Sequence, residues 1–270
     1  MKVSIYKNNS TKSQTIGNIL SKLLSRYPDT FVFDDAKPDV VITVGGDGTL
    51  LSAFHHYVDQ LDHTRFIGVH TGHLGFYADW QEFEIDHLVD SLLTYEGRTI
   101  SYPLLEMTIQ YTDGKKNNFL ALNEAAIKQP EGTLVADVYL DGERFERFRG
   151  DGLTAATPTG STAYNKANGG AVMHPSLASI QLSEIASINN RVFRTLGSPL
   201  VIGPDETIRV VPLNVDNGVT LTYDHLSQAT TDIEWLEFRV AKEKIAFAEH
   251  RHTRFWHRVR DSFIGDEVID

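Results

Sequence analysis

The chain has 270 residues, of which 41% are hydrophobic and 23% charged, and its formal net charge is -11. This balance predicts one large or two modest globular domains, and the acidity argues against general nucleic-acid binding, which favours a basic face. Cysteine is absent, which excludes disulfides, thiolate zinc sites and cysteine nucleophiles. Because there is no signal-peptide apolar core and no apolar run of membrane-spanning length, we expect a cytoplasmic protein.

The first hundred residues alternate between strand and helix patterns. Strands are predicted at Val3 to Tyr6, Phe31 to Phe33, Val40 to Val44 and Phe66 to Val69, and helices at Ile16 to Tyr27, Leu50 to Leu61 and Ile85 to Leu93. The run from Val40 to Val44 is apolar without alternation, which is typical of a strand buried on both faces of a parallel sheet. We therefore expect a doubly wound α/β domain over residues 1–100, with ligands beyond the carboxyl ends of its strands.

Alternating β patterns dominate residues 101–240 and predict a β-rich, β-sandwich-like second domain. Extended segments are expected at Leu104 to Tyr111, Phe119 to Ile127, Leu134 to Leu140, Ile208 to Leu213, Val219 to Tyr223 and Ile233 to Val240, with hairpin turns at Asp113-Gly114 and Asp141-Gly142 and one helix near Ser183 to Ser187.

A tail follows at residues 241–270. Phe255, Trp256, Val259 and Phe263 have near-helical spacing, and we expect the tail to pack back on the first domain. Its basic part, Arg251 to Arg260, predicts a solvated face or an oligomer contact rather than a nucleic-acid patch.

A glycine-rich turn, Gly45-Gly46-Asp47-Gly48-Thr49, separates the strand at Val40 to Val44 from a helical pattern. Glycines allow the close approach of a ligand, and the amides at a helix N-terminus favour negative charge. Asp47 is the one carboxylate in this backbone. The turn therefore indicates a base for a hydroxyl that receives phosphate, or an anchor for Mg²⁺. The alternative is an ordinary βα turn whose aspartate lies early in the helix.

Two further stretches are unusual for a purely structural role. Asn123 and Glu124 interrupt the apolar run from Phe119 to Ile127. A buried amide and carboxylate need partners, for which ribose hydroxyls are suitable, and the alternative is a surface bend in a strand. The stretch from Arg149 to Tyr164 is rich in small and hydroxyl residues. It predicts a long loop that offers amides and hydroxyls to a phosphate or a base edge.

Eleven histidines occur, and none has a familiar metal-binding spacing. Most are expected to be ordinary surface or hydrogen-bonded residues, while His70, His73 and His225 lie in or near suspected loops and are candidates for ligand contacts. The P-loop motif and the protein-kinase signature set are absent, and no Gly-x-Gly-x-x-Gly follows a strand, which argues against a dehydrogenase.

An ordered set of motifs resembles the NAD kinase family. It consists of Gly45-Gly46-Asp47-Gly48-Thr49, Thr71-Gly72-His73-Leu74-Gly75-Phe76, Asn123-Glu124, Gly150-Asp151-Gly152, Thr157-Pro158-Thr159-Gly160-Ser161-Thr162-Ala163-Tyr164, Gly169-Gly170 and His174-Pro175. The Gly-Gly-Asp-Gly turn alone also occurs in diacylglycerol and sphingosine kinases and in phosphofructokinase. The ordered set is more specific, and the chain is similar to the short form of Gram-positive bacteria.

This resemblance implies that ATP or polyphosphate, with Mg²⁺ or another divalent cation, phosphorylates the 2′-hydroxyl of the adenosine ribose of NAD⁺. It implies that Asp47 is the general base or positions that hydroxyl, that Asn123 and Glu124 hold ribose hydroxyls, and that Asp151 meets the nicotinamide end. The phosphate-binding residues would be Gly45, Gly46, Gly48, Thr49 and Arg149. The NAD-binding residues would be Asp47, Gly48, Phe76, Tyr77, Asn123, Glu124, Asp151, Thr159, Thr162, Ala163, Tyr164, Asn165, Lys166, Ala167, Ala186, Ile188 and His225, with Thr162 to Tyr164 lining the adenine pocket.

The family usually forms dimers or tetramers with shared sites, so Tyr164 to Ala167 or Ala186 would serve a neighbour's site. The chain departs from the family pattern at Ser198-Pro199-Leu200, at Tyr164 to Ala167 and at His70, which bears on the donor preference and on the nicotinamide pocket. Two other functions stay open at this stage: a lipid or sugar kinase built on the same glycine turn, and a non-catalytic dinucleotide-binding sensor.

Overall fold

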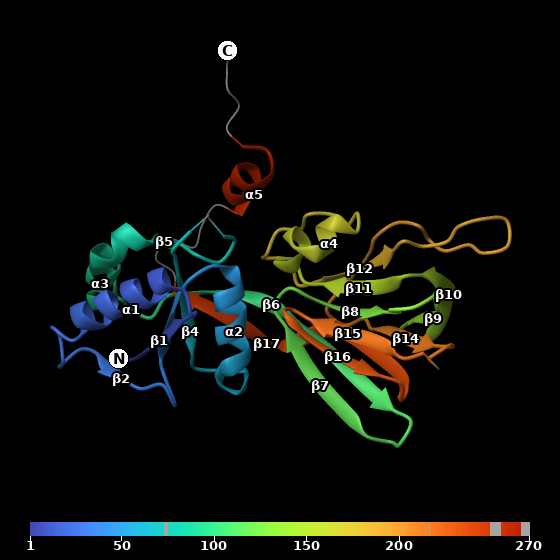
Figure 1. Cartoon of the computed structure of the whole chain (residues 1–270), viewed down its shortest axis with the longest axis horizontal. Coiled ribbons are helices and arrows are strands. Elements are labelled where there is room, and N and C mark those ends of the chain that lie inside the picture. Colours follow the sequence, from blue (N-terminus) through green and yellow to red (C-terminus); the bar gives the residue numbers. More distant parts are fainter. Residues whose placement is uncertain (73–74, 216, 249–254, 266–270) are drawn as a thin grey trace, which may run out of the picture. The chain divides into compact units, whose positions relative to one another are not determined.

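The computed structural model describes residues 1–72, 75–215, 217–248 and 255–265. The chain forms two compact units, one from Met1–Ser101 with Lys244–Asp270 and one from Tyr102–Glu243 (Figure 1). Among the described residues, no helix is both long and apolar enough to cross a membrane. Each unit has its own apolar core, so each is described by itself.

The first unit is a parallel sheet flanked by helices. Its elements are β1 (Lys2–Lys7), α1 (Thr11–Leu24), β2 (Val32–Phe33), β3 (Val40–Val44), α2 (Asp47–His56), β4 (Arg65–His70), β5 (Trp80–Gln81), α3 (Ile85–Leu93) and α5 (Phe255–Phe263). The strand order is β2-β1-β3-β4, with the end of β17 (Ile233–Ala248) beside β4. All five residues of β3 are buried, which confirms the prediction of a strand covered on both faces.

The winding of the chain explains why the helices cover both faces of this sheet. From β1 the chain moves outward to β2, and from β3 it moves in the opposite direction to β4. Because such crossovers are right-handed, α1 and α2 must lie on opposite faces. Figure 1 shows α1 and α3 on one side of the strands and α2 on the other. The predicted doubly wound α/β fold is confirmed, and the direction of winding reverses between β1 and β3.

The second unit consists of two sheets that share one core. Its elements are β6 (Thr99–Tyr111), β7 (Lys116–Ala121), β8 (Glu124–Lys128), β9 (Leu134–Leu140), β10 (Glu143–Gly150), β11 (Gly152–Ala156), α4 (Tyr164–Ala167), β12 (Ile180–Ile185), β13 (Leu200–Ile202), β14 (Ile208–Pro212), β15 (Val219–Tyr223), β16 (Leu226–Thr230) and most of β17. One sheet has the order β13-β12-β11-β8-β15-β16, and the other contains β10, β9, β14, β17, β6 and β7. Buried side chains from both sheets, such as Phe148 and Leu153, belong to the same core, which confirms the β-rich domain.

Two sequence predictions in this unit are wrong. The segment near Ser183 to Ser187 is not a helix, because β12 occupies Ile180–Ile185 and pairs with β11 from Gly152 to Ala156. The stretch from Arg149 to Tyr164 is not one long loop, since β10 ends at Gly150 and β11 is fully buried in mid-sheet. Its small residues resemble those of a loop, yet they fit a strand that is paired on both sides by β8 and β12.

The apolar run from Phe119 to Ile127 is two strands rather than one. β7 belongs to one sheet and β8 to the other, so the chain changes sheets at Leu122 and Asn123. Both of these residues are buried, with exposed fractions of 0% and 8%. The break is therefore an interior crossing and not a surface bend.

Candidate functional site

Asp47 lies at the first position of α2, directly after the N-cap residue Gly46. Its carboxylate is half-buried and accepts hydrogen bonds from the backbone N–H groups of Phe76 (2.9 Å) and Tyr77 (3.1 Å). Gly75 makes this approach possible, because a Cβ atom there would lie 2.2 Å from Oδ1 of Asp47. Each carboxylate oxygen retains a second lone pair, so Asp47 is held in place and can still accept a proton or a further hydrogen bond.

The backbone around Asp47 is shaped by its glycines. A Cβ atom at Gly45 would lie 2.1 Å from Oγ1 of Thr49, whereas a Cβ atom at Gly46 or Gly48 would meet no protein atom within 4 Å. Gly45 is therefore needed for packing inside the turn, and the other two glycines border open space. No side chain caps the first-turn amides of α2, so this helix end suits an anion.

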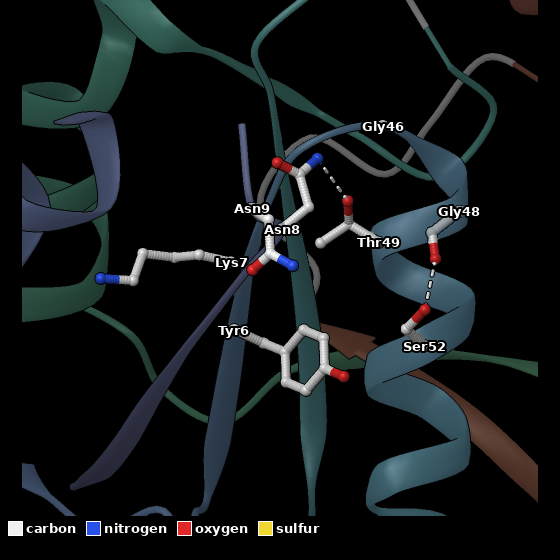
Figure 2. Close-up of a pocket in the computed structure, with 8 residues that line it drawn as sticks. All are labelled: Tyr6, Lys7, Asn8, Asn9, Gly46, Gly48, Thr49 and Ser52. Carbon is white, nitrogen blue, oxygen red and sulfur yellow. Dashed lines mark hydrogen bonds between the residues drawn. The ribbon is translucent and has the colours of Figure 1, made fainter. Parts of the chain in front are cut away.

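A pocket of about 550 Å³ occupies that open space. Its lining residues come from the ends of β1 and β3 and from the start of α2 (Figure 2): Tyr6, Lys7, Asn8, Asn9, Gly46, Gly48, Thr49 and Ser52. Asn8 joins the two sides through a hydrogen bond from Nδ2 to Oγ1 of Thr49 (3.1 Å). The pocket lies at the carboxyl ends of β1 and β3, where the winding reverses, which is the usual ligand position in such sheets.

Lys7 is the one cation among the residues that line this pocket. Its side chain points away from α2 in Figure 2. Nζ donates to Oδ1 of Asn18 (3.0 Å), and the stem packs against Gly17 of α1. In this structure, therefore, the groups at the pocket wall that suit an anion are the backbone amides at the start of α2.

The loop that covers Asp47 also contacts α5. Arg258 donates to the carbonyl oxygen of Phe76 and forms an ion pair with Asp79. The ring of Phe76 lies 6.4 Å from that of Phe255 and 5.8 Å from that of Phe263, centroid to centroid. The basic tail was expected to form a solvated face or an oligomer contact. Arg258 does not lie on a solvated face, because its side chain is only 13% exposed.

Two further sequence candidates lie at the end of β4 and in the loop after it. His70 is buried, and its Nδ1 lies 3.2 Å from the carbonyl oxygen of Gly72. His73 and its neighbour Leu74 lie outside the described residues. Arg251 to Arg254, part of the basic tail, lie outside them as well.

The Asn123–Glu124 pair is held by its backbone in the second unit. The hydroxyl of Thr157 donates to the carbonyl oxygen of Leu122 (2.6 Å), and the N–H of Thr157 donates to that of Asn123 (2.8 Å). Gly160 packs so closely that a Cβ atom would lie 2.0 Å from the carbonyl oxygen of Asn123. The predicted Thr157–Gly160 turn and the predicted polar pair are thus brought together.

Glu124 is a largely buried acid of intermediate exposure. Burial is the main cause that raises the pKa of its carboxyl group to about 8, and the negative charge of Asp224 adds to the effect. Lys128 and a hydrogen bond from the backbone of Tyr164 act in the opposite direction. One carboxyl oxygen, Oε2, is buried without a hydrogen-bond partner, which is a costly arrangement unless a ligand satisfies it.

The candidate residues of α4 lie beside this pair. The ammonium group of Lys128 lies 4.0 Å from the centroid of the Tyr164 ring, a cation–π contact. Asn165 is fully buried, and its Oδ1 accepts a hydrogen bond from Ser183 (2.7 Å). Its side chain therefore fixes α4 to β12. Thr159 and Thr162 are also buried, while Ala163, Lys166 and Ala167 are at least partly exposed.

A second group of candidates surrounds the other end of β11: Arg149, Asp151, Ala186 and Ile188. The N–H of Ile188 donates to the carbonyl oxygen of Arg149 (2.8 Å), and the Arg149 guanidinium lies 4.1 Å from the Phe193 ring centroid. Asp151 and Thr157 flank the two ends of β11, so they lie roughly 20 Å apart at about 3.3 Å per residue. One chain thus places the predicted NAD-binding residues of this unit in two groups.

Sequence reasoning missed two parts of the site. No residue of the Tyr6–Asn9 segment was a site candidate, because strand order, which brings this segment beside α2, cannot be read from one sequence. Asp224 was passed over in favour of its neighbour His225, which is exposed at the tip of the β15–β16 hairpin. The signal for that turn was the polar dipeptide Asp224-His225 between two extended segments, which is typical of a two-residue hairpin turn.

Across the described ranges, no group of three or more His, Cys, Asp or Glu side chains has the geometry of a metal site. Mg²⁺ commonly uses one or two carboxylates together with substrate phosphates. The remaining lone pairs of Asp47 and the neighbouring pocket fit such a shared site.

Comparison with known families gives two matches. The ATP-NAD kinase N-terminal domain model matches residues 3–97, and the ATP-NAD kinase C-terminal domain model matches residues 122–249. The NAD kinase of Leuconostoc citreum is 57% identical over 266 residues, which cover 98% of this chain and 99% of the relative. The NAD kinase of Levilactobacillus brevis is 55% identical over 268 residues, which cover 99% of each chain.

Two solved structures share the fold. Yeast NADH kinase complexed with NADH superposes with a TM-score of 0.81 at 20% identity, covering 99% of this chain and 88% of that one. An NAD kinase from Archaeoglobus fulgidus in complex with ATP gives a TM-score of 0.73 at 22% identity, covering 96% and 99%. At these identities the likeness concerns the fold alone.

Proposed function

The chain belongs to the NAD kinase family, and from this premise we propose which of its residues carry the reaction. NAD kinases phosphorylate NAD to NADP using ATP, and this is the activity of the chain. A hydroxyl oxygen of the adenosine ribose attacks the γ-phosphorus of ATP, the bond from that phosphorus to the β–γ bridging oxygen breaks, and ADP leaves. The hydroxyl proton needs an acceptor, because a neutral hydroxyl is a weak nucleophile.

Asp47 is that acceptor, or it orients the hydroxyl. The observation that carries this assignment is the pair of hydrogen bonds from Phe76 and Tyr77, which fix the carboxylate without using all of its lone pairs. The residues on either side of it, Gly46 and Gly48, line the pocket. A carboxylate fixed next to a phosphate-binding wall is the arrangement that transfer to a hydroxyl requires.

The donor phosphates bind in the pocket of Figure 2, against Gly46, Gly48 and Thr49. The amides of α2 and its dipole stabilise the transferring charge. This local device is needed because the chain carries a net charge of -11 and attracts no anion by its overall field. Mg²⁺ supplies charge neutralisation on the donor phosphates when it is bound, and Asp47 is the side chain that would reach it.

The nucleotide acceptor binds at Asn123, Glu124 and α4. The unpartnered Oε2 of Glu124 supports this, since a ribose hydroxyl can act as donor or acceptor towards it. The rings and stems of Tyr164 and Lys128 offer an apolar and cationic wall for a base. Polyphosphate as an alternative donor is tested in the assay described below.

A homo-oligomer completes the site in this proposal. The group formed by Arg149, Asp151, Ala186 and Ile188 lies at the far end of β11 from Asn123 and Thr157, which supports its use by a neighbouring subunit. Co-expression of Asp47→Asn and Asp151→Ala chains tests this sharing. A shared site restores about a quarter of the wild-type rate, because mixed dimers regain one intact site, whereas unshared sites restore none.

The decisive assay incubates the purified chain with Mg²⁺, NAD⁺ and either ATP or polyphosphate, and detects NADP⁺ with an NADP-specific dehydrogenase. We expect NADP⁺ with ATP. Binding of NAD⁺ without turnover by either donor would contradict the enzyme assignment and favour a dinucleotide sensor. Transfer of phosphate to a lipid or sugar, but not to NAD⁺, would favour another kinase on the same turn.

A further inference from the structure

The chain crosses between the two sheets of the second unit at Leu122 and Asn123, and this crossing leaves backbone groups that no β ladder can satisfy. The N–H groups of Leu122 and Asn123 are consecutive donors that both point to one acceptor. Asp224 is that acceptor: its Oδ2 lies 3.0 Å from N of Leu122, and its Oδ1 lies 2.7 Å from N of Asn123. One carboxylate therefore fixes the orientation of the two peptide groups that carry the N–H groups of Leu122 and Asn123.

The contact is reciprocal. The N–H of Asp224 donates to the carbonyl oxygen of Glu124 (2.8 Å). Asp224 itself has a left-handed backbone conformation, with φ 51°, at the start of the turn between β15 and β16. The turn is thus tied to the Asn123–Glu124 pair on one side, while Thr157 and Gly160 hold the same pair from the other side.

Asp224 also acts on Glu124 through its charge. Burial raises the pKa of Glu124 to about 8, and the neighbouring Asp224 is the next cause. The opposing groups are Lys128 on the same strand and the backbone N–H of Tyr164 at the start of α4. At neutral pH the Glu124 carboxyl group is thus mainly protonated, so its O–H is a hydrogen-bond donor to a ligand.

Resting on the proposed function, we propose that Asp224 is a positioning residue of the nucleotide site: its carboxylate aligns the Asn123–Glu124 pair through the amides of Leu122 and Asn123, and its charge lies beside Glu124, the side chain that meets the acceptor nucleotide. Asp224 does not touch the reacting atoms. Its loss is therefore expected to weaken binding of NAD⁺ more than it lowers the turnover of bound NAD⁺.

If Asp224 served only to form the hairpin turn, a different result would be expected. Aspartate and asparagine both tolerate the left-handed conformation, and glycine adopts it freely. If Asp224 only served the hairpin, Asp224→Asn would behave like the wild type. Asp141 offers a matched control, because it has φ 49° in the β9–β10 hairpin, donates its N–H to Thr207, and accepts the N–H of Thr207 at 2.8 Å.

The experiment measures NAD⁺ binding by calorimetry between pH 6 and pH 9 for the wild type, Asp224→Asn, Asp141→Asn and Glu124→Gln, with NADP⁺ formation measured in parallel. For Asp224→Asn we expect Kd and KM for NAD⁺ to rise about tenfold at pH 7, the size of one lost charge-assisted hydrogen bond. The KM for ATP should stay unchanged. Asp141→Asn should stay within about twofold of the wild type.

The pH profile separates positioning from simple structural damage. In the wild type, NAD⁺ affinity should fall as the pH rises through about 8, because deprotonation removes the donor. Asp224→Asn should shift this midpoint to lower pH, since the like charge is gone. Glu124→Gln should abolish the dependence, because an amide always donates.

The outcomes are separable. Unchanged NAD⁺ affinity and an unchanged midpoint in Asp224→Asn, with normal NADP⁺ formation by the wild type, would overturn the role of Asp224 alone. Absence of NADP⁺ from the wild type would contradict the proposed function instead. If Asp224→Asn fails to fold, carbon-13 NMR titration of the Glu124 carboxyl group in the ligand-free wild type decides. A midpoint near 4.5 would overturn the proposal, and a raised midpoint is the expected result.

Discussion

The carboxylate of Asp47 is fixed by the amides of Phe76 and Tyr77, at 2.9 Å and 3.1 Å. The helix of Asp47 and the loop of Phe76 follow adjacent parallel strands, β3 and β4, so the sheet itself brings them together. This relationship turns an early-helix aspartate into an oriented group. It also means that the loop after β4 controls the position of this carboxylate.

Replacing Asp47 by Asn removes the proton acceptor and leaves the side chain the same size. We expect the rate of NADP⁺ formation to fall by about 10² to 10⁴, the usual contribution of a general base. NAD⁺ affinity should change little, because Asn123 and Glu124 carry that contact in the proposal. Asp39→Asn is the control, since Asp39 also accepts a backbone N–H (Lys2, 2.7 Å) but is exposed. A rate within tenfold of the wild type would refute the role of Asp47 as base.

Replacing Gly75 by Ala should impair the enzyme without a change at Asp47 itself. The new Cβ atom would lie 2.2 Å from Oδ1 of Asp47, so the carboxylate must move. Because a displacement of about 1 Å can cost about 10² in rate, we expect kcat to fall by roughly that factor. Gly203→Ala is the control, since its nearest neighbour is 3.5 Å away. Equal kcat values for the two variants would show that the loop does not position Asp47.

Replacing Gly48 by Ala should separate stability from donor binding. No protein atom lies within 4 Å of the new Cβ, and alanine favours a helix over glycine by up to about 1 kcal/mol. We therefore expect an unchanged or higher Tm together with a KM for ATP raised about tenfold, because the methyl group enters the pocket. Gly45→Ala should instead lower the Tm, since it collides with Thr49. A normal KM for ATP in Gly48→Ala would place the donor elsewhere.

Stability should depend on pH through Glu124. Its pKa is raised from 4.5 to about 8 in the folded state, so the folded chain binds the proton more tightly than the unfolded chain. This contribution is fully present below pH 4.5 and is lost as the pH rises through about 8. At about 1.4 kcal/mol per pKa unit, the loss is on the order of a few kcal/mol.

The measurement is urea unfolding of the wild type and Glu124→Gln at pH 5 and pH 9. At pH 5 the free energy of unfolding of Glu124→Gln should be equal to or lower than that of the wild type. At pH 9 the variant should be more stable relative to the wild type, because an amide never acquires the buried charge. A constant difference between the two proteins at both pH values would contradict a raised pKa for Glu124.

Local sequence determined much of the chemistry. The unbroken apolar run at Val40 to Val44 required a fully buried strand, and the glycines after it required a tight βα turn, because both depend only on neighbouring residues. The polar interruption at Asn123–Glu124 indicated a site for the same reason, since buried polar groups need partners. The local sequence pattern gave wrong predictions for two strands: β11 was interpreted as a loop, and part of β12 as a helix. Small residues occur both in loops and in buried strands, and the pairing of a strand with its neighbours is a nonlocal property.

The sequence by itself thus determined the two kinds of domain, the aspartate in the glycine turn and the polar pair at Asn123–Glu124. Only the tertiary structure decided what holds these groups. Strand order placed Tyr6 to Asn9 opposite Gly48 and the loop of Phe76 over Asp47, and antiparallel pairing of β8 with β15 brought Asp224 to Asn123, 101 positions away in the chain. Hydrogen bonds and charge act over a few ångströms in space, and a sequence pattern records only neighbours along the chain.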